Sequence, residues 1–229
     1  MTDGCFLIGC GPSLNKIDVA LLAHHHTITF NRAYVAWDKW GFTPNYYACF
    51  DMVTLATYSS EIRGLITDNP HIGFFLNERA LDYGIYSTNQ VTLIQVKEGT
   101  TFSTDLLTVT DFGNVGASSL QILAALKYRR VVLVGVDARY NLRNTDHCKD
   151  VKGLLQHDNF NNHFSCDYEK SLPRFVEPDL QKILGQWPNV ASECRRLGLE
   201  VRNASPGSAL TSFPMISFED ALVWIDKGA

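Results

Sequence analysis

The sequence predicts an α/β fold, a Rossmann-like, doubly wound and mostly parallel sheet with an inserted lid region. Short, continuously apolar segments recur along the chain, and the clearest are residues 5–9 and 131–135. Helical segments separate them, with the strongest patterns at 116–126 and 178–197. Apolar strands that alternate with helices are typical of a parallel sheet covered on both faces. A length of 229 residues suits one domain, 1–229, that carries an insertion.

The remaining elements follow from the same patterns. Short apolar runs next to turn residues predict further strands at 27–30, 46–50, 71–76, 91–96 and 199–203. Helical spacing and stop residues such as Gly41 predict helices at 17–23, 33–40 and 217–225. Ser217 is the expected N-cap of the last helix. Residues 97–114 are polar and rich in threonine, and we expect a loop there.

Residues 138–173 differ from the rest of the chain because they are polar and rich in Asn, His and Asp. The stretch is too long for an ordinary connection, and long insertions in compact domains are often functional lids. We therefore expect a lid over the site.

Composition and charge narrow the class of protein. A hydrophobic fraction of 45% with 19% charged residues excludes a disordered chain. A net charge of −4 argues against nucleic acid as a partner. No apolar run reaches the roughly 20 residues that span a bilayer, and the N-terminus lacks the basic start of a signal peptide. The six scattered cysteines are expected to be reduced thiols, which favours a cytoplasmic location.

In an open parallel sheet, ligands bind beyond the carboxyl ends of the strands, and this rule nominates residues 9–13 first. Gly9 and Gly11 permit a tight turn, and Pro12 and Ser13 then begin a helix. Free amide groups at such a helix start would suit a phosphate. The alternative is a tight turn without a ligand. The pattern is neither the dinucleotide fingerprint nor a Walker loop.

Other strand ends carry polar side chains, and each of these could have either a ligand-binding role or a structural role. Asn31, next to Arg32, could contact a base or a sugar hydroxyl, or could simply form a turn. Asp51 and Asp137 could bind a metal or hydroxyl groups, whereas the alternatives are an N-cap for Asp51 and solvated strand-end polarity for Asp137. The serines at 118–119, Ser118 and Ser119, mark a second anion site at a helix start, or cap that helix.

The positions of the histidines argue against a metal site. The run at 24–26 ends a predicted helix, and the spacing of His147, His157, His163 and Cys166 matches no familiar zinc site. His163 is the best candidate for a general base, because imidazole exchanges its proton near neutral pH. The alternative is a solvated loop histidine. We expect no metal and no cofactor.

Several short motifs, in order, resemble one superfamily. Residues 8–14 (IGCGPSL), 30–32 (FNR) and 50–51 (FD) resemble the opening of the bacterial lipooligosaccharide sialyltransferases. They are also similar to the related motility-associated-factor glycosyltransferases. Residues 116–119 (GASS) and 133–140 (LVGVDARY) resemble the second half of that pattern, and 162–164 (NHF) and 203–208 (NASPGS) extend it.

The resemblance implies a Rossmann-like fold with a late lid and a CMP-linked donor such as CMP-sialic acid. It implies inverting, metal-independent transfer to a glycan acceptor in lipopolysaccharide biosynthesis. The carried-over roles are Gly9, Gly11, Pro12 and Ser13 under the phosphate and ribose, Asn31, Ser118 and Ser119 at the donor, Tyr140 and Tyr168 at the leaving phosphate, and His163 as base. Arg32, Asp51 and Asp137 complete the expected substrate-binding set.

Two positions depart from the sialyltransferase pattern, because this chain has Cys10 and Asp51 where asparagine is usual. Asp51 looks more like the motility-factor branch. Two other functions stay open. One is a diphosphokinase similar to the archaeal hydroxymethylpterin enzymes, in which Asp51 and Asp137 would hold Mg²⁺. The other is a nucleotide-binding module without catalysis. The sequence also leaves open peripheral membrane association and a homo-oligomer.

Overall fold

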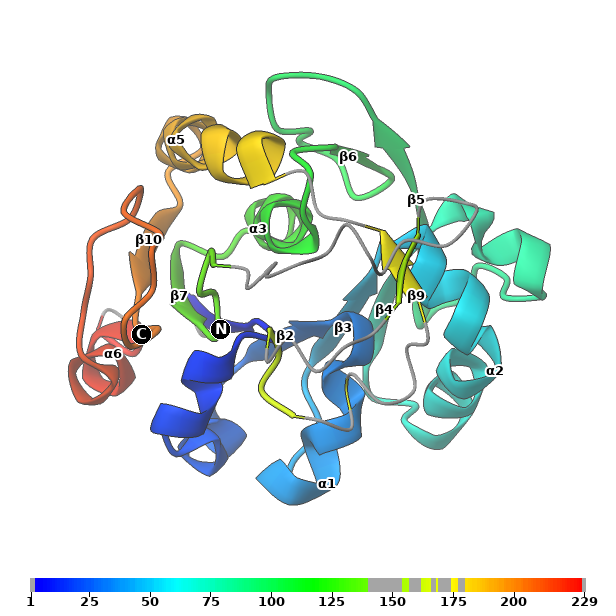
Figure 1. Ribbon diagram of the computed structural model, residues 1–229, viewed down its shortest axis with the longest axis horizontal. Coiled ribbons are helices and arrows are strands. Elements are labelled where there is room, and N and C mark those ends of the chain that lie inside the picture. Colours follow the sequence, from blue (N-terminus) through cyan, green and yellow to red (C-terminus); the bar gives the residue numbers. More distant parts are fainter. Residues whose placement is uncertain are drawn as a thin grey trace.

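In the computed structural model, an eight-stranded sheet forms the centre of the chain, with strand order β10-β7-β1-β2-β3-β4-β5-β6 (Figure 1). The structure describes residues 3–139, 154–156, 162–165, 168, 174–176 and 180–227. All seven neighbouring pairs of this sheet are parallel, which confirms the predicted fold class. The strands are β1 (Gly4–Ile8), β2 (Thr27–Phe30), β3 (Tyr46–Cys49), β4 (Gly73–Asn77), β5 (Val91–Lys97), β6 (Thr108–Thr110), β7 (Arg130–Val134) and β10 (Glu200–Asn203).

Helices cover both faces of the sheet (Figure 1). One face packs against α3 (Val115–Ala125) and α5 (Leu180–Arg196). The other face packs against α1 (Trp37–Trp40), α2 (Met52–Asp68), α6 (Phe218–Ile225) and the 3₁₀ helices η1 (Pro12–Lys16), η2 (Val19–His24), η3 (Asn31–Ala36) and η4 (Glu78–Tyr83).

The central strands are apolar throughout because both of their sides are buried. Along β7, Val132 and Val134 face the layer of α2 and α6, whereas Val131 and Leu133 face α3 and α5. All four side chains are fully buried. A strand with two buried faces reads as a continuous apolar run, and this is why β1 and β7 were clear in the sequence.

The strand order places a switch in direction between β1 and β7. From β1 the chain adds strands in one direction as far as β6, then returns to β7 on the other side of β1 and continues to β10. Leu7 of β1 pairs with Ile28 of β2 on one side and Leu133 of β7 on the other. The crevice beyond the carboxyl ends of β1 and β7 is therefore the expected ligand site of this topology.

Some predicted elements are wrong in type or extent. The helices expected at 17–23 and 33–40 are largely 3₁₀, namely η2 and η3, and only Trp37–Trp40 is α-helical. A 3₁₀ helix rises more per residue, so a short connection between parallel strands can span its distance. The loop expected at 97–114 contains the edge strand β6, whose threonines suit a strand and whose pairing with β5 supplies backbone hydrogen bonds.

The last third of the chain follows the prediction more closely. The elements α5, β10 and α6 match the expected segments, and the Ser217 hydroxyl accepts from the Asp220 amide at 3.0 Å as the N-cap of α6. The expected lid, 138–173, is described only in part. Its described residues include β8 (Leu154–Gln156), which pairs antiparallel with β9 (Arg174–Val176).

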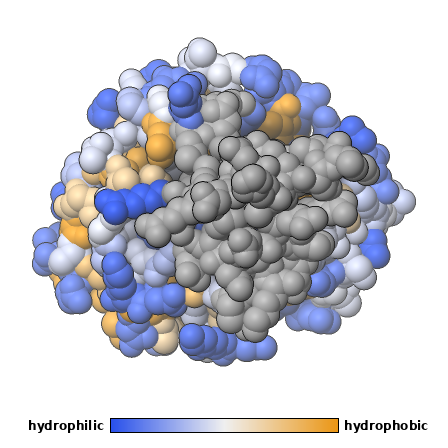
Figure 2. Space-filling view, in the orientation of Figure 1, coloured by the Kyte–Doolittle hydropathy of each residue, from blue (hydrophilic) through white to orange (hydrophobic). Residues whose placement is uncertain are grey.

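The surface view of Figure 2 shows apolar residues as separate patches between polar ones around the rim of this face. Among the described residues, no helix is both long and apolar enough to cross a membrane.

Candidate functional site

The candidate site lies at the carboxyl edge of the sheet, where the turns after β1 and β7 meet. The Gly9 amide donates to the Val134 carbonyl at 2.7 Å, and the Gly11 amide donates to the Gly135 carbonyl at 2.8 Å. The two turns are thereby joined to each other at the topological switch point of the sheet. The amides of Gly9 and Gly11 therefore have partners within the chain and are not among the free amides expected for a phosphate.

Gly11 is required by the closeness of the two turns. A Cβ atom on Gly11 would lie 2.6 Å from the Asp137 Cγ atom and 2.8 Å from the Gly135 oxygen. Such separations do not occur between unbonded atoms, so a side chain at this position would push the turns apart. The glycine therefore serves backbone packing at the site, in addition to any contact with a ligand.

Asp137 is bound to the start of η1. Its Oδ2 atom accepts from the Ser13 amide at 2.9 Å, and its Oδ1 atom accepts from the Ser13 hydroxyl. The carboxylate is half-buried. The Asp137 carboxylate thus already occupies the start of η1, where the sequence predicts an external anion. Pro12, which has no amide hydrogen, is the first residue of η1.

A loop after β10 holds the Asp137 turn in place. The Val136 amide donates to the Ser205 hydroxyl at 2.9 Å, and the Ser208 hydroxyl donates to the Val136 carbonyl at 2.7 Å. The Ala209 amide donates to the Asp137 carbonyl at 2.9 Å. From the sequence alone, these serines are predicted only to lie in a turn and to extend the motif resemblance. Their separation of about seventy residues from Val136 hid this supporting role.

Asn31 has the clearest structural mark of a ligand-binding residue. It follows β2 with a φ of 51°, a left-handed conformation that is uncommon outside glycine. The Tyr47 hydroxyl donates to its backbone carbonyl at 2.7 Å. Its side-chain Oδ1 atom is buried and has no hydrogen-bond partner within the described residues. Buried acceptors are normally satisfied, so this one is suited to a ligand donor.

Arg32 points its charge into the protein. Only 3% of the residue is exposed, and its guanidinium carbon lies 4.2 Å from the centre of the Tyr58 ring. The Nη1 atom donates to the Tyr168 backbone carbonyl at 2.5 Å. Arg32 thus connects the end of β2 to the region expected as a lid, and its charge is stabilised by aromatic faces.

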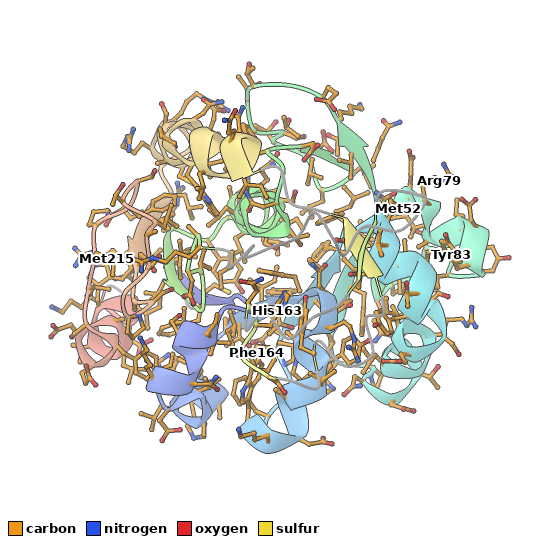
Figure 3. The ribbon with its side chains drawn as sticks, viewed as in Figure 1. Met52, Arg79, Tyr83, His163, Phe164 and Met215 are labelled. Atoms are coloured by element: carbon orange, nitrogen blue, oxygen red, sulfur yellow. The ribbon has the colours of Figure 1, made fainter. Side chains whose placement is uncertain are left out.

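The short segment 162–165 lies directly on the turn after β1. The Phe164 amide donates to the Cys10 carbonyl at 2.9 Å, and the Asn15 side chain donates to the Phe164 carbonyl at 2.7 Å. The Phe164 ring is buried against Trp40, with ring centres 5.8 Å apart. These contacts bring a segment more than 140 residues away onto the candidate site (Figure 3).

The same segment places His163 beside Tyr168. Their rings are stacked with centres 4.0 Å apart and an angle of 16° between the planes. Tyr168 is buried, whereas His163 is half-exposed. The stacking fixes the imidazole plane through a neighbour that Arg32 holds by its carbonyl. The structure therefore brings His163, Tyr168 and Arg32 together at the carboxyl edge.

Cys10 adds no charge to the site. Burial raises the pKa of its thiol to about 12, although a hydrogen bond with Tyr168 acts in the opposite direction. The thiol also lies 3.6 Å from the Phe30 carbonyl, to which it donates. A neutral thiol thus stands where the sialyltransferases usually have an asparagine. The described cysteines are all buried, unpaired thiols, at positions 5, 10, 49 and 194.

Asp51 is the N-cap of α2, which was one of the two alternatives predicted for it. Its Oδ1 atom accepts from the Thr54 amide at 2.8 Å, and the residue is exposed. The next residue, Met52, lies apart from His163 in Figure 3. The capping role accounts for this carboxylate without a ligand.

Ser118 and Ser119 lie inside α3 and do not cap it. The N-cap is Asn114, whose Oδ1 atom accepts from the Ala117 amide at 2.8 Å. The Ser119 hydroxyl donates to the Val115 carbonyl at 2.8 Å, so it is used within the helix. Both serines are buried. The expected start of this helix was one residue late, and the capping alternative for the serines is therefore wrong.

Other predicted residues fall outside this description. Tyr140, His147, His157 and Cys166 lie outside the described residues. Among the described residues, no three His, Cys, Asp or Glu side chains form a metal-binding group. In the run at 24–26, the His25 ring lies 3.5 Å from the Asp226 carboxylate and His26 is hydrogen-bonded to the Tyr128 hydroxyl.

No protein-family model and no curated protein matches the chain in sequence, but solved structures match its fold. The MAf glycosyltransferase from Magnetospirillum magneticum AMB-1 is similar with a TM-score of 0.57 and 15% identity, over 95% of this chain and 34% of that one. The chain thus spans about a third of that protein's length.

Two structures of the sialyltransferase CstII from Campylobacter jejuni are also similar. The complex with cytidine-5'-monophosphate has a TM-score of 0.54 and 12% identity, over 93% of this chain and 84% of that one. The complex with CMP-3FNeuAc has a TM-score of 0.52 and 12% identity, over 93% and 86%. The chain therefore has the same fold as these MAf and CstII glycosyltransferase structures, and the Rossmann-like fold that the resemblance implied is confirmed.

Proposed function

We propose that the chain is a glycosyltransferase that moves an acidic, sialic-acid-like sugar from a CMP-activated donor to a glycan acceptor. The proposed transfer inverts the anomeric centre and needs no metal ion. The observation that carries this proposal is the docking of segment 162–165, with His163, on the turn after β1. It combines a candidate base with the crevice in which a fold of this kind binds ligands. The CstII structures of the same fold were solved with CMP and CMP-3FNeuAc.

His163 is the proposed general base. The imidazole would take the proton of an acceptor hydroxyl while the oxygen attacks the anomeric carbon and the bond to the CMP phosphate oxygen breaks. A single displacement of this kind inverts the anomeric centre. Stacking on Tyr168 limits the orientations of the ring, which favours a defined proton-transfer geometry. Tyr140 and Tyr168 stay proposed partners of the leaving phosphate on the strength of the resemblance.

Charge in the crevice supports an anionic donor only in part. Arg32 is a buried cation on the β2 side, and its charge lowers the cost of a nearby phosphate. Next to it, the Asn31 Oδ1 atom is an acceptor that none of the described residues satisfies. The turn with Gly9, Gly11 and Ser13 is proposed to hold the nucleotide by its shape, because the amides of these three residues already have partners.

The remaining parts of the proposal concern the cellular location, the acceptor and the other donor contacts. We place the reaction in the cytoplasm, supported by the unpaired thiols at 5, 10, 49 and 194. A role in lipopolysaccharide synthesis and the glycan acceptor rest on the resemblance. Ser118 and Ser119 stay proposed donor contacts from the same source, and Asp51 stays a proposed substrate contact because it follows the end of a strand.

The first test is a panel of CMP, CDP, UDP, GDP and ATP, each with Mg²⁺ and with EDTA, read by thermal unfolding. We expect CMP to raise the melting temperature in EDTA, because a ligand that binds only the folded state stabilises it. Stabilisation by ATP with Mg²⁺ alone would instead favour the diphosphokinase. Tight CMP binding without any turnover of CMP-sialic acid would favour the binding module.

The second test replaces the base. His163→Ala should lower the transfer rate by about a hundredfold to ten-thousandfold, with little change in CMP affinity. His71→Ala is the matched control, because His71 is an exposed histidine next to β4 whose ring is hydrogen-bonded to the Thr43 hydroxyl. An active His163→Ala enzyme would remove this residue as the base.

A further inference from the structure

We infer that Asp137 determines donor specificity, and that its carboxylate selects a nucleotide with a single phosphate over a nucleoside diphosphate. This inference rests on the proposed function, since it assumes that the nucleotide lies in the crevice between β1 and β7. It goes beyond that function because it assigns the choice between phosphate numbers to one side chain. It also gives a physical reason for a carboxylate in a site that receives an anionic ligand.

The Asp137 carboxylate lies against the glycine turn after β1. Asp137 Oδ2 accepts from the Ser13 amide at 2.9 Å, and the Asp137 Cγ atom would be 2.6 Å from a Cβ atom on Gly11. The carboxyl group thus rests against the backbone of the glycine turn. In glycine-rich nucleotide loops, this backbone face and its amides receive the phosphates. Here a side-chain anion occupies that face.

The backbone around Asp137 holds the carboxylate in that position. The Asp137 backbone carbonyl accepts from the Ala209 amide at 2.9 Å, and the neighbouring Val136 is hydrogen-bonded to two serine side chains. The preceding Gly135 has a φ of 68°, which fixes a sharp turn after β7. A ligand phosphate would therefore meet a positioned negative charge, and moving it away would break several hydrogen bonds.

The remaining capacity of the carboxylate suits a sugar hydroxyl. A carboxylate offers about four acceptor positions, and Ser13 uses two of them. Acceptors attract hydroxyl groups, such as those of ribose, and repel phosphate oxygens. Asp137 is half-buried, so this repulsion is less screened than at a fully exposed position. A nucleoside monophosphate can place ribose here, whereas a diphosphate adds a further charge nearby.

The test compares CMP with CDP in the full chain and in Asp137→Asn. Asparagine is nearly isosteric and can still accept from the Ser13 amide, so the turn is expected to keep its form. Binding is measured by calorimetry in EDTA, at low and at high salt. We expect the wild-type protein to prefer CMP, and Asp137→Asn to reduce the ratio of the CDP and CMP dissociation constants by about ten- to a hundredfold at low salt. High salt should reduce this difference.

A matched variant separates charge from scaffold. Ser13→Ala removes one hydrogen bond to the carboxylate and keeps its charge, so the CDP-to-CMP ratio is expected to stay close to the wild-type ratio. An equal loss of CMP and CDP affinity in Asp137→Asn, with an unchanged ratio, would overturn the inference and leave Asp137 as a scaffold residue. The same holds if CDP binds only with Mg²⁺ and Asp137→Asn abolishes it, because Asp137 would then be a metal ligand.

Failure of the inference can be told from failure of the proposed function. If CMP binds but no sugar is transferred, the ratio still decides the role of Asp137 while the enzyme assignment fails. If no nucleotide binds under any condition, both are overturned.

Discussion

Replacing Gly11 with alanine is expected to lower the free energy of unfolding by about 2–4 kcal/mol. The new Cβ atom would lie 2.6 Å from the Asp137 Cγ atom and 2.8 Å from the Gly135 oxygen, which is a backbone atom at the end of a central strand. Overpacking of this kind costs about 1–3 kcal/mol. Separation of the turns would also weaken the hydrogen bond from Gly11 to Gly135, worth about 1 kcal/mol, and the hydrogen bonds that Ser13 donates to the Asp137 carboxylate.

The assay is urea and thermal unfolding, in which Gly11→Ala is compared with a substitution at a glycine whose Cβ position is free. For a chain of this size, about 2–4 kcal/mol corresponds to a fall in melting temperature of roughly 4–16 °C. Gly64 is the control, because a Cβ atom there meets no described atom within 4 Å outside the backbone of its own helix, α2. Gly64→Ala should raise stability by up to about 1 kcal/mol. Equal stability of the two variants would refute the view that the turns after β1 and β7 are closely packed.

Three further predictions test the cap of α2, the ion pair of Glu193 with Arg196, and the contact of Arg32 with Tyr168. Asp51→Ala should cost about 0.5–2 kcal/mol of stability in thermal unfolding, whereas Asp51→Asn should keep the cap of α2; an equal loss in both would contradict a capping role. The Arg196 guanidinium holds the pKa of Glu193 below its usual value. The stability from Glu193 is therefore complete above the ordinary glutamate pKa of about 4.3, and is lost as pH falls toward the lowered value. Glu193→Gln should flatten the acid limb of urea midpoints measured between about pH 3 and 6, and an unchanged limb would argue against this pair. Arg32→Lys should lower kcat for transfer by about tenfold or more, with a smaller change in CMP affinity, because lysine keeps the charge but lacks the planar guanidinium that lies over the Tyr58 ring and donates to the Tyr168 carbonyl. The reverse pattern in kinetics and calorimetry would make Arg32 a donor contact.

The sheet could be predicted from the sequence because burial on both faces leaves a local trace. Strands β1 and β7 are apolar at every position that packs against a helix layer. Strand β6 leaves no such trace, because it has three residues at the edge of the sheet and two of them are threonine. Its pairing with β5 depends on a partner that the local sequence does not reveal. This short edge strand is therefore missed, whereas the central strands are found.

The candidate site was predictable residue by residue but not in its pairings. The strand-end rule nominated both Ser13 and Asp137, yet their hydrogen bond joins positions 124 residues apart. Gly11 was expected to give room for a phosphate, and its room is instead taken by Asp137. The contact of Phe164 with Cys10 was equally hidden. Local patterns indicate which residues lie at an edge, but tertiary contacts decide which of them still have unused hydrogen-bonding groups.

Asn31 is the position where this distinction leads to a stability test. Its left-handed backbone and its buried Oδ1 atom, which has no hydrogen-bond partner in the described part of the chain, both raise the energy of the free protein. Asn31→Gly removes both costs and keeps the backbone carbonyl that accepts from the Tyr47 hydroxyl. The free energy of unfolding should therefore rise by about 0.5–2 kcal/mol, while CMP affinity falls by roughly threefold to tenfold through the loss of one hydrogen bond. Asn31→Ala loses the same amide but retains a Cβ atom at positive φ, so it should be less stable than Asn31→Gly. A fall in the stability of Asn31→Gly would show that the asparagine side chain supports the fold, and its place at the site would then need another explanation.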